Sequence, residues 1–217
     1  MSKLVWDNTG ERFYELGVDR GVLYTSSSTT YDKAEAWNGL TAVNESPSGA
    51  ETSPIYADNT KYGELQSTEE FAATVECYTY PKSFEECDGS VEVAKGVTIG
   101  QQTRKSFGFS YRTKVGNDVD GQDHAYKIHL VYGCKAAPSE KSYNTINDNP
   151  DANTFSYDFT TTPVPVTGKK PTSHLIVDSR TADSTKLAAL EKVLYGDVST
   201  EGKLPMPDEV IRMMTGD

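Results

Sequence analysis

Three stretches of the chain alternate apolar and polar residues, and this alternation limits the fold more than any other feature of the sequence. Residues 105–114 read KSFGFSYRTK, residues 124–133 read HAYKIHLVYG, and residues 154–162 read TFSYDFTTT. Successive side chains of a β-strand point to opposite faces, so each stretch predicts a strand with one buried face. The polar segment NDVDGQD at 117–123 separates the first two stretches and predicts an antiparallel hairpin.

Further patterns complete a fold that is mainly β. Residues 71–80 and 174–178 read as strands, and residues 81–89 read as one helical turn between Pro81 and Gly89. The only convincing helical period covers 183–195, with Asp183 or Ser184 as N-cap and Gly196 following it. We therefore expect a β-sandwich or barrel-like fold of antiparallel sheets flanked by one α-helix.

The segments outside these patterns define the expected domain organisation. Residues 1–20 lack a sustained period but carry many apolar residues, so they form either an N-terminal strand on the protein's own core or an arm that docks elsewhere. Residues 21–196 form the β-sandwich domain, including a long hairpin loop at 38–60 and the helix at 183–195. Residues 197–217 form a proline-broken C-terminal tail, in which residues 208–214 can add a turn or two of helix.

Composition excludes several classes of protein. The formal charge is −11, and no stripe of Lys and Arg with interleaved aromatic residues follows any predicted element, which argues against tight nucleic-acid binding. The apolar runs are too short for a membrane-spanning helix. Three cysteines, an odd number, in a chain that starts without an apolar leader indicate free thiols in a reducing cytoplasm.

Motifs for catalysis and for metal binding are missing from the sequence. Searches for a nucleophile elbow, a phosphate-binding loop and a dinucleotide fingerprint fail. The Asp-rich turn at 116–127 has Gly116 and Lys127 where a calcium loop requires ligands. His124 and His129 are five residues apart, so one strand would place them on opposite faces. We expect no enzyme activity, no cofactor and no metal, although a pair of catalytic carboxylates stays an open alternative.

The strand at 154–162 ends in a way that indicates controlled pairing. Pro163 and Pro165 lack the N–H group that a ladder needs, so they stop pairing at a fixed point. One interpretation is a strand that pairs with a neighbouring subunit, with Phe155, Tyr157 and Phe159 as its inter-subunit candidates. The other is a single-copy fold whose edge is blunted by proline.

Four stretches of the chain resemble one known family. They are AWNGLTAVNESPSGAE…PIYADN (36–59), ECDGS…GVTIGQQTRKSFGFSYRTKVGND (86–118), YKIHLVYGCKAAPSEKSYNTIND (126–148) and FSYDFTTTPVPVTGKKPTSHLIVDS (155–179). In this order they are similar to the major tail tube protein of bacteriophages with long, non-contractile tails. The similarity extends roughly from Leu4 to Gly196.

The resemblance implies a structural virion protein. Members of this family form hexameric rings in which sheets join edge to edge, and the rings stack into a tube through which DNA leaves the particle. The implied partners are further copies of the chain, a tape measure protein, a tail terminator and distal tail proteins, and the implied location is the virion tail after synthesis in the host cytoplasm. The N-terminal arm, the long loop and the C-terminal segment are the expected ring-to-ring contacts. Our ring-stacking candidates are Trp6, Phe13, Tyr14, Asn44, Pro47, Ile55 and Tyr56.

The acidic balance has a use in such a tube. A negatively charged lumen lets DNA slide without sticking, because like charges repel. Alternation selects Glu64, Glu76 and Asp158 as lumen candidates. The alternative function is a β-sandwich carbohydrate-binding module that would use some of the thirteen tyrosines as stacking platforms.

Overall fold

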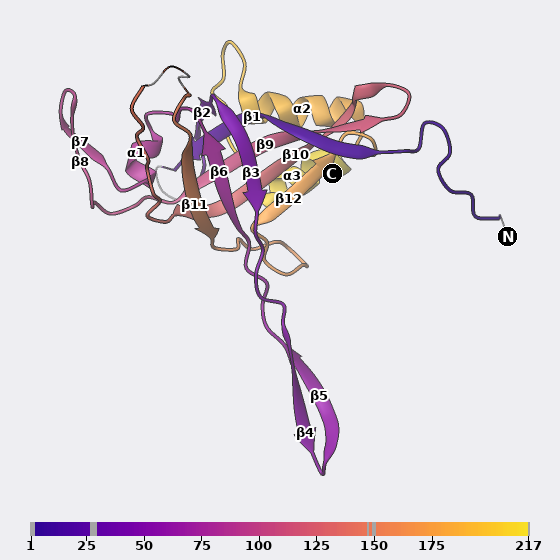
Figure 1. Cartoon of the computed structure of the whole chain (residues 1–217). Coiled ribbons are helices and arrows are strands. Elements are labelled where there is room, and N and C mark those ends of the chain that lie inside the picture. The colour runs from indigo at the N-terminus through magenta and orange to yellow at the C-terminus, as the bar shows by residue number, and fades with distance from the viewer. Residues whose placement is uncertain (1–2, 27–29, 147, 149–150, 217) are drawn as a thin grey trace.

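The computed structural model describes residues 3–26, 30–146, 148 and 151–216, and it is mainly β with antiparallel sheets and few helices. The expected β-sandwich-like class is therefore confirmed. Residues 1–2 of the expected arm and residue 217 of the expected tail lie outside the described residues. Figure 1 shows one body from which several narrow segments project.

The body is built on an eight-stranded sheet. Seven of its strands follow the order β2-β1-β9-β10-β11-β6-β3, and the eighth, β12, pairs with β10. Two separate two-stranded hairpins, β4–β5 and β7–β8, project from it. The strands are β1 (Tyr14–Thr25), β2 (Lys33–Trp37), β3 (Leu40–Glu45), β4 (Thr52–Ala57), β5 (Thr60–Gln66), β6 (Ala72–Cys77), β7 (Val91–Ala94), β8 (Val97–Ile99), β9 (Phe107–Asn117), β10 (Gly121–Ala136), β11 (Phe155–Thr161) and β12 (His174–Asp178). The helices are α1 (Phe84–Cys87), α2 (Ser184–Tyr195) and α3 (Pro207–Thr215).

Strand β10 is the longest strand and connects most of the sheet. Along one edge it pairs with β9, while along the other edge it pairs first with β12 and then with β11. The change of partner coincides with an irregularity between Val131 and Cys134, where Gly133 has a φ of +63°. A Cβ at Gly133 would lie 2.2 Å from the carbonyl oxygen of Thr162, so only glycine fits this close approach.

Two hydrophobic clusters lie on the two faces of the sheet. The first is aromatic and fills the curve of the sheet: Phe84 of α1 contacts the rings of Trp37, Phe107 and Tyr157 at centroid distances of 4.7, 5.6 and 4.8 Å. The second lies between the sheet and the helices, where Leu187, Leu190 and Leu194 of α2 pack with residues of β10. Strand alternation explains this division, since Ile128, Leu130 and Tyr132 of β10 face the helices whereas Val131 faces the aromatic cluster. The irregularity at Gly133 reverses the alternation, so that Cys134 and Ala136 face the aromatic cluster.

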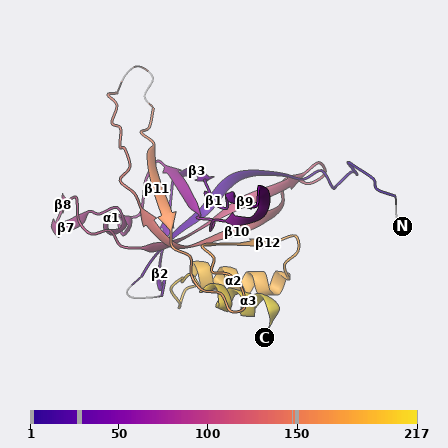
Figure 2. The same cartoon turned by 90° about the horizontal axis from the view of Figure 1, so that it is seen from below.

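Helix α2 begins and ends where the sequence places it. The side chain of Asp183 accepts hydrogen bonds from the backbone N–H groups of Thr185 and Lys186, both at 3.0 Å, and Gly196 follows the last turn. These contacts satisfy donors that a helix start leaves free. Figure 2 shows α2 and α3 together on one side of the sheet.

The described C-terminal residues pack on the body, and α3 covers the turn or two of helix expected at 208–214 of the C-terminal tail. Leu204 and Val210 are buried in the second cluster, and the Tyr132 hydroxyl donates to the carbonyl of Pro205 at 3.0 Å. Lys186 of α2 donates to the carbonyls of Met214 and Thr215, which holds the end of α3. The burial of Leu204 and Val210 depends on contacts with distant strands and helices, which the local pattern around the prolines does not record.

The strand with the inter-subunit candidates pairs within the chain. Strand β11 ends at Thr161, just before Pro163; one edge is paired along most of its length and the other is paired at its end. It pairs with β6 from Phe155 to Thr160 and with the end of β10 from Phe159 to Thr161. Phe155, Tyr157 and Phe159 pack in or against the aromatic cluster. Among the described residues, the edges that the sheet order leaves unpaired are those of β2, β3 and β12.

Two further expectations concern thiols and membranes. Cys77, Cys87 and Cys134 are free and buried, as the odd number predicts. None of the helices among the described residues is long and apolar enough to cross a membrane.

Phe84 tests the aromatic cluster. It is 1% exposed and sits on a helix of only four residues, so its ring rather than the helix holds α1 in place. We expect Phe84→Ala to lower the free energy of unfolding by about 3–5 kcal/mol, because it leaves a cavity among packed rings. Urea denaturation measures the change. Phe13→Ala, at a half-exposed position, is the matched control and should cost less than about 1 kcal/mol; equal losses in the two variants would contradict this account.

Candidate functional site

The long hairpin is the most extended feature of the molecule. It is one antiparallel ribbon that starts as the β3–β6 ladder and continues through backbone hydrogen bonds between Ser46 and Ala72, Ser48 and Glu70, and Glu51 and Ser67. It ends in β4–β5, with a tip at Asp58 and Asn59. Figure 1 shows this ribbon leaving the body as a narrow rod. At about 3.3 Å per residue, the strand from 46 to 57 reaches up to about 40 Å.

The sequence placed this hairpin wrongly. The expected loop at 38–60 includes β3, which belongs to the main sheet, and omits β5, which forms the returning strand. Asp58 and Asn59 have φ angles of 49° and 63°, so both adopt the left-handed conformation of a two-residue type I′ turn. The Asp-Asn pair between two β-rich stretches was the signal that could have identified the tip.

The β4–β5 hairpin at the end of the ribbon, which we call the distal hairpin, is exposed to solvent on both faces. Every residue of β4 and β5 is exposed except Gly63, which is half-buried. Its apolar side chains include Ile55, Tyr56, Tyr62 and Leu65, and the Tyr62 side chain is 77% exposed. A two-stranded hairpin alone in water is marginally stable at best. The apolar side chains of this hairpin are therefore left in contact with solvent in the single chain.

Three other segments present apolar side chains in the same way. In the N-terminal segment Leu4, Val5 and Trp6 are exposed, and Trp6 is 74% exposed. In the β7–β8 hairpin every residue is exposed, including four large apolar ones, Val91, Val93, Val97 and Ile99. In the described part of the segment between β10 and β11, Tyr143 and Ile146 are exposed. Figures 1 and 2 show that the N-terminal segment and β7–β8 lie at opposite ends of the body. We call these four segments the projecting arms.

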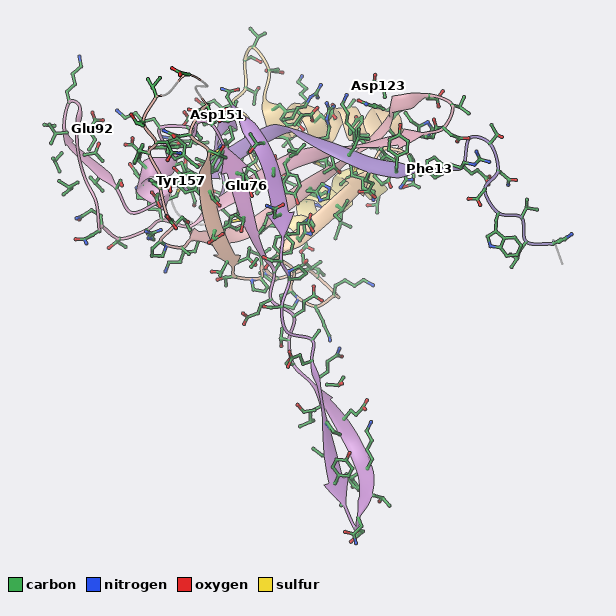
Figure 3. All side chains as sticks on the ribbon, viewed as in Figure 1. Phe13, Glu76, Glu92, Asp123, Asp151 and Tyr157 are labelled. Carbon is green, nitrogen blue, oxygen red and sulfur yellow. The ribbon has the colours of Figure 1, made fainter. Side chains whose placement is uncertain are left out.

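The base of the N-terminal arm is anchored to the β9–β10 turn. The backbone N–H of Gly10 donates to Asp118 at 2.9 Å, and the Phe13 ring lies 5.4 Å from that of His124. Figure 3 shows Phe13 where the arm meets the body. Strand β1 begins at Tyr14, so the arm is shorter than the expected 1–20, and residues 14–20 belong to the sheet.

The ring-stacking candidates are divided between arms and body. Trp6, Phe13 and Tyr14 lie along the N-terminal arm or at its base, and Ile55 and Tyr56 lie on the distal hairpin. Pro47 lies at the root of the hairpin. Asn44 lies in β3, where its amide donates to Glu76 at 2.9 Å, so this candidate belongs to a sheet surface. Tyr62, Leu65 and the β7–β8 hairpin are not among the predicted candidates, although the alternation VEV at 91–93 and the turn at 95–96 are ordinary hairpin signals.

The lumen candidates are divided as well. Glu76 and Asp158 lie on one face of adjacent strands, where Asp158 accepts a hydrogen bond from Thr74 at 2.5 Å. Glu64 lies far away on the distal hairpin and pairs with Lys61. The face shared by Glu76 and Asp158 consists of small, polar and acidic residues: Ala42, Asn44, Ala72, Thr74, Glu76, Ser156, Asp158 and Thr160. We call it the polar face; Lys135, opposite Thr160, lies at its margin.

A group of titratable side chains lies at the root of the long hairpin. Glu45 at the end of β3, His129 of β10 and His174 of β12 approach one another, and we call them the histidine cluster. Nδ1 of His129 lies 3.1 Å from Nε2 of His174 and 3.4 Å from Oε1 of Glu45. The Tyr111 hydroxyl donates to Glu45, and its ring is parallel to that of His129. Sequence spacing missed the cluster because its members come from three strands that only the fold brings together.

Burial and charge shift the titration of the cluster. Burial lowers the pKa of His174 to about 4, with the charge of Glu45 partly opposing this effect. The contact with His129 lowers the pKa of Glu45 to about 2, with burial opposing and the Tyr111 hydroxyl adding to the decrease. At neutral pH the cluster therefore contains a neutral His174 beside a carboxylate.

Comparison of the chain with protein-family models and with curated proteins gives no match. The functional conclusion therefore depends on the arms, the polar face and the resemblance of the four stretches.

The arms lead to a prediction about stability. Replacing residues 50–67 with a two-residue Asn-Gly turn should change the free energy of unfolding by less than about 1 kcal/mol, because the distal hairpin contributes no core contacts. Urea denaturation with circular dichroism measures the change. A loss of the cooperative transition would contradict the view that the body folds without this hairpin.

The histidine cluster leads to a prediction about pH. Between pH 6.5 and about 4 the unfolded chain takes up a proton at His174 that the folded chain does not. The free energy of unfolding should therefore fall as the pH is lowered through this range, by on the order of 2 kcal/mol. In His174→Gln this part of the decrease should be absent, whereas His124→Gln, outside the cluster, should keep it. Urea titrations with a chelator present measure the slopes, and identical slopes in wild type and His174→Gln would contradict the prediction.

Proposed function

We propose that this chain is the subunit of a bacteriophage tail tube of the long, non-contractile kind. In this proposal it forms hexameric rings, the rings stack into a tube, and DNA passes through the lumen without specific binding. Ring number, partners and location in the virion tail come from the resemblance of the four stretches. The observation that carries the proposal is the distal hairpin, whose apolar residues Ile55, Tyr56, Tyr62 and Leu65 are exposed in the described part of the chain.

The placement of the arms supports assembly by one repeated contact. Arms at opposite ends of the body let one copy contact the next with different surfaces. Such a heterologous contact forms a ring when its rotation closes, and a filament when it repeats along an axis. A tube of stacked rings needs both kinds of contact. The projecting arms supply more than one apolar surface for this purpose.

The polar face supports the assignment of a lumen wall. It carries Glu76 and Asp158, and the opposite face of the same strands packs in the aromatic cluster through Ala73, Val75 and Phe159. Helices α2 and α3 lie on the opposite side of the body from β3 and β11 (Figure 2). Small side chains and negative charge give a wall that repels DNA phosphates rather than binding them. Glu64 is placed by the same proposal in a contact between rings, because it lies on the distal hairpin.

The carbohydrate-binding alternative has weaker support. A stacking platform needs exposed aromatic rings grouped on one surface. Here Tyr24, Tyr31, Tyr111, Tyr132 and Tyr157 are buried. The most exposed aromatic rings are spread over three arms: Trp6 on the N-terminal arm, Tyr143 between β10 and β11, and Tyr56 with Tyr62 on the distal hairpin. We therefore favour assembly over sugar binding, and neither proposal includes catalysis.

Electron microscopy of the concentrated full-length protein tests the proposal. We expect rings or hollow tubes for the wild type. The double variant Tyr56→Asp, Tyr62→Asp should lose tubes while keeping its unfolding midpoint, because it places charges on the exposed distal hairpin. The matched control is Tyr78→Asp, at an exposed tyrosine of the body, which should still assemble.

One outcome would overturn the proposal. A wild-type chain that stays monomeric at high concentration, even with tail initiator proteins added, would not be a tube subunit. Binding of an oligosaccharide by the same monomer would then favour the carbohydrate-binding alternative.

A further inference from the structure

The histidine cluster has the donor set of a metal site. Two imidazoles and one carboxylate come from three strands, and their potential ligand atoms all lie within 4.8 Å of one another. Among first-row metals, zinc takes this combination of nitrogen and oxygen donors at about 2.0–2.2 Å, in tetrahedral geometry. Calcium and magnesium prefer oxygen donors alone. The chemistry of the cluster therefore favours zinc over the alkaline-earth ions.

The distances fit one small ion. Tetrahedral bonds of about 2.0–2.2 Å place neighbouring ligand atoms about 3.3–3.6 Å apart. Nδ1 of His129 lies 3.4 Å from Oε1 of Glu45 and 3.1 Å from Nε2 of His174. The third pair, a nitrogen of His174 and a carboxylate oxygen of Glu45, lies within 4.8 Å, with Nδ1 of His174 4.0 Å from Oε2 of Glu45. A rotation of the exposed Glu45 side chain would bring the three ligands to bonding distance from a common centre. Three protein ligands leave a fourth position for water.

Neighbouring side chains fix the orientation of these ligands. Thr113 Oγ1 lies 3.0 Å from Nε2 of His129, which leaves the opposite ring nitrogen, Nδ1, directed toward the cluster. The ring of Tyr111 is parallel to that of His129 at 4.5 Å, and Phe71 packs on His174 at the same centroid distance. Hydrogen bonds to the second imidazole nitrogen are a regular feature of metal-binding histidines.

The cluster is buried on one side and accessible on the other. The His129 and His174 side chains are 7% and 15% exposed, whereas the Glu45 side chain is 36% exposed. An ion can therefore enter past Glu45 and be held by the two imidazoles beneath. Glu45 also directly precedes Ser46, the first residue of the projecting ribbon.

We propose that Glu45, His129 and His174 bind one zinc ion that fastens the root of the long hairpin to β10 and β12. The ion links an edge strand to two strands of the central sheet, across sequence separations that no short motif provides. Binding to a site that exists only in the folded chain stabilises the folded state. The proposal concerns the isolated subunit and does not depend on tube assembly.

Metal titration tests the proposal directly. The full-length protein is freed of metal with a chelator, exchanged into buffer with excess Mg²⁺ to occupy acidic surface groups, and titrated with Zn²⁺ by calorimetry. We expect one ion per chain with micromolar or tighter affinity. Titration with Co²⁺ should give the visible absorption of a four-coordinate site with nitrogen and oxygen donors.

Variants assign the site. His174→Gln and Glu45→Gln should each weaken Zn²⁺ binding by about 10-fold or more. The control His124→Gln removes a histidine outside the cluster and should bind as the wild type does. Circular dichroism and the urea midpoint in chelator show whether each variant is folded, and only folded variants are compared. Zn²⁺ should also raise the thermal midpoint of the wild type but not that of His174→Gln.

Two results would overturn the proposal. The first is the absence of stoichiometric Zn²⁺ binding by the folded wild type, which would make the cluster a hydrogen-bonded group without a metal. The second is binding that survives in folded His174→Gln and Glu45→Gln, which would place the ion elsewhere.

Discussion

The pairing of β10 with three neighbours is the constraint on which the rest of the structure depends. One strand forms ladders with β9, β12 and β11, and the change of partner requires the close approach at Gly133. Because its two faces contribute to different clusters, β10 also separates the aromatic cluster from the helix-covered one. The same strand carries His129 into contact with β12, so the histidine cluster is a consequence of this pairing as well.

A packed body with exposed arms is the second consequence of this arrangement. The aromatic cluster and the two longer helices bury the apolar residues of the sheet, whereas the large apolar side chains of the projecting arms stay exposed. Exposed apolar side chains gathered on narrow projections are unusual for a chain that works alone, and they mark contact surfaces. The fold is linked to the proposed function because the body buries its apolar residues within one chain. The apolar residues of the arms would be buried only by contact with another chain.

The root of the long hairpin joins these two parts. Glu45 accepts the Tyr111 hydroxyl and approaches two imidazoles, so β3 is held to the sheet by side chains as well as by its ladder with β6. A metal ion at this point would restrict motion at the root of the long hairpin and leave the distal hairpin free to move. A fixed root and a mobile tip would suit the proposed role of the long hairpin, which is to contact a neighbouring subunit.

The sequence alone determined the elements whose signal is local. Alternation identified the strands around Phe107, Ile128 and Tyr157, and capping residues identified α2, because each depends on neighbours within a few positions. Only the tertiary structure decided which strand edges stay free, that residues 197–216 pack on the core, where the long hairpin turns, and that Glu45, His129 and His174 meet. These features depend on contacts between residues far apart in the chain, and no local pattern records which distant strand will become a neighbour.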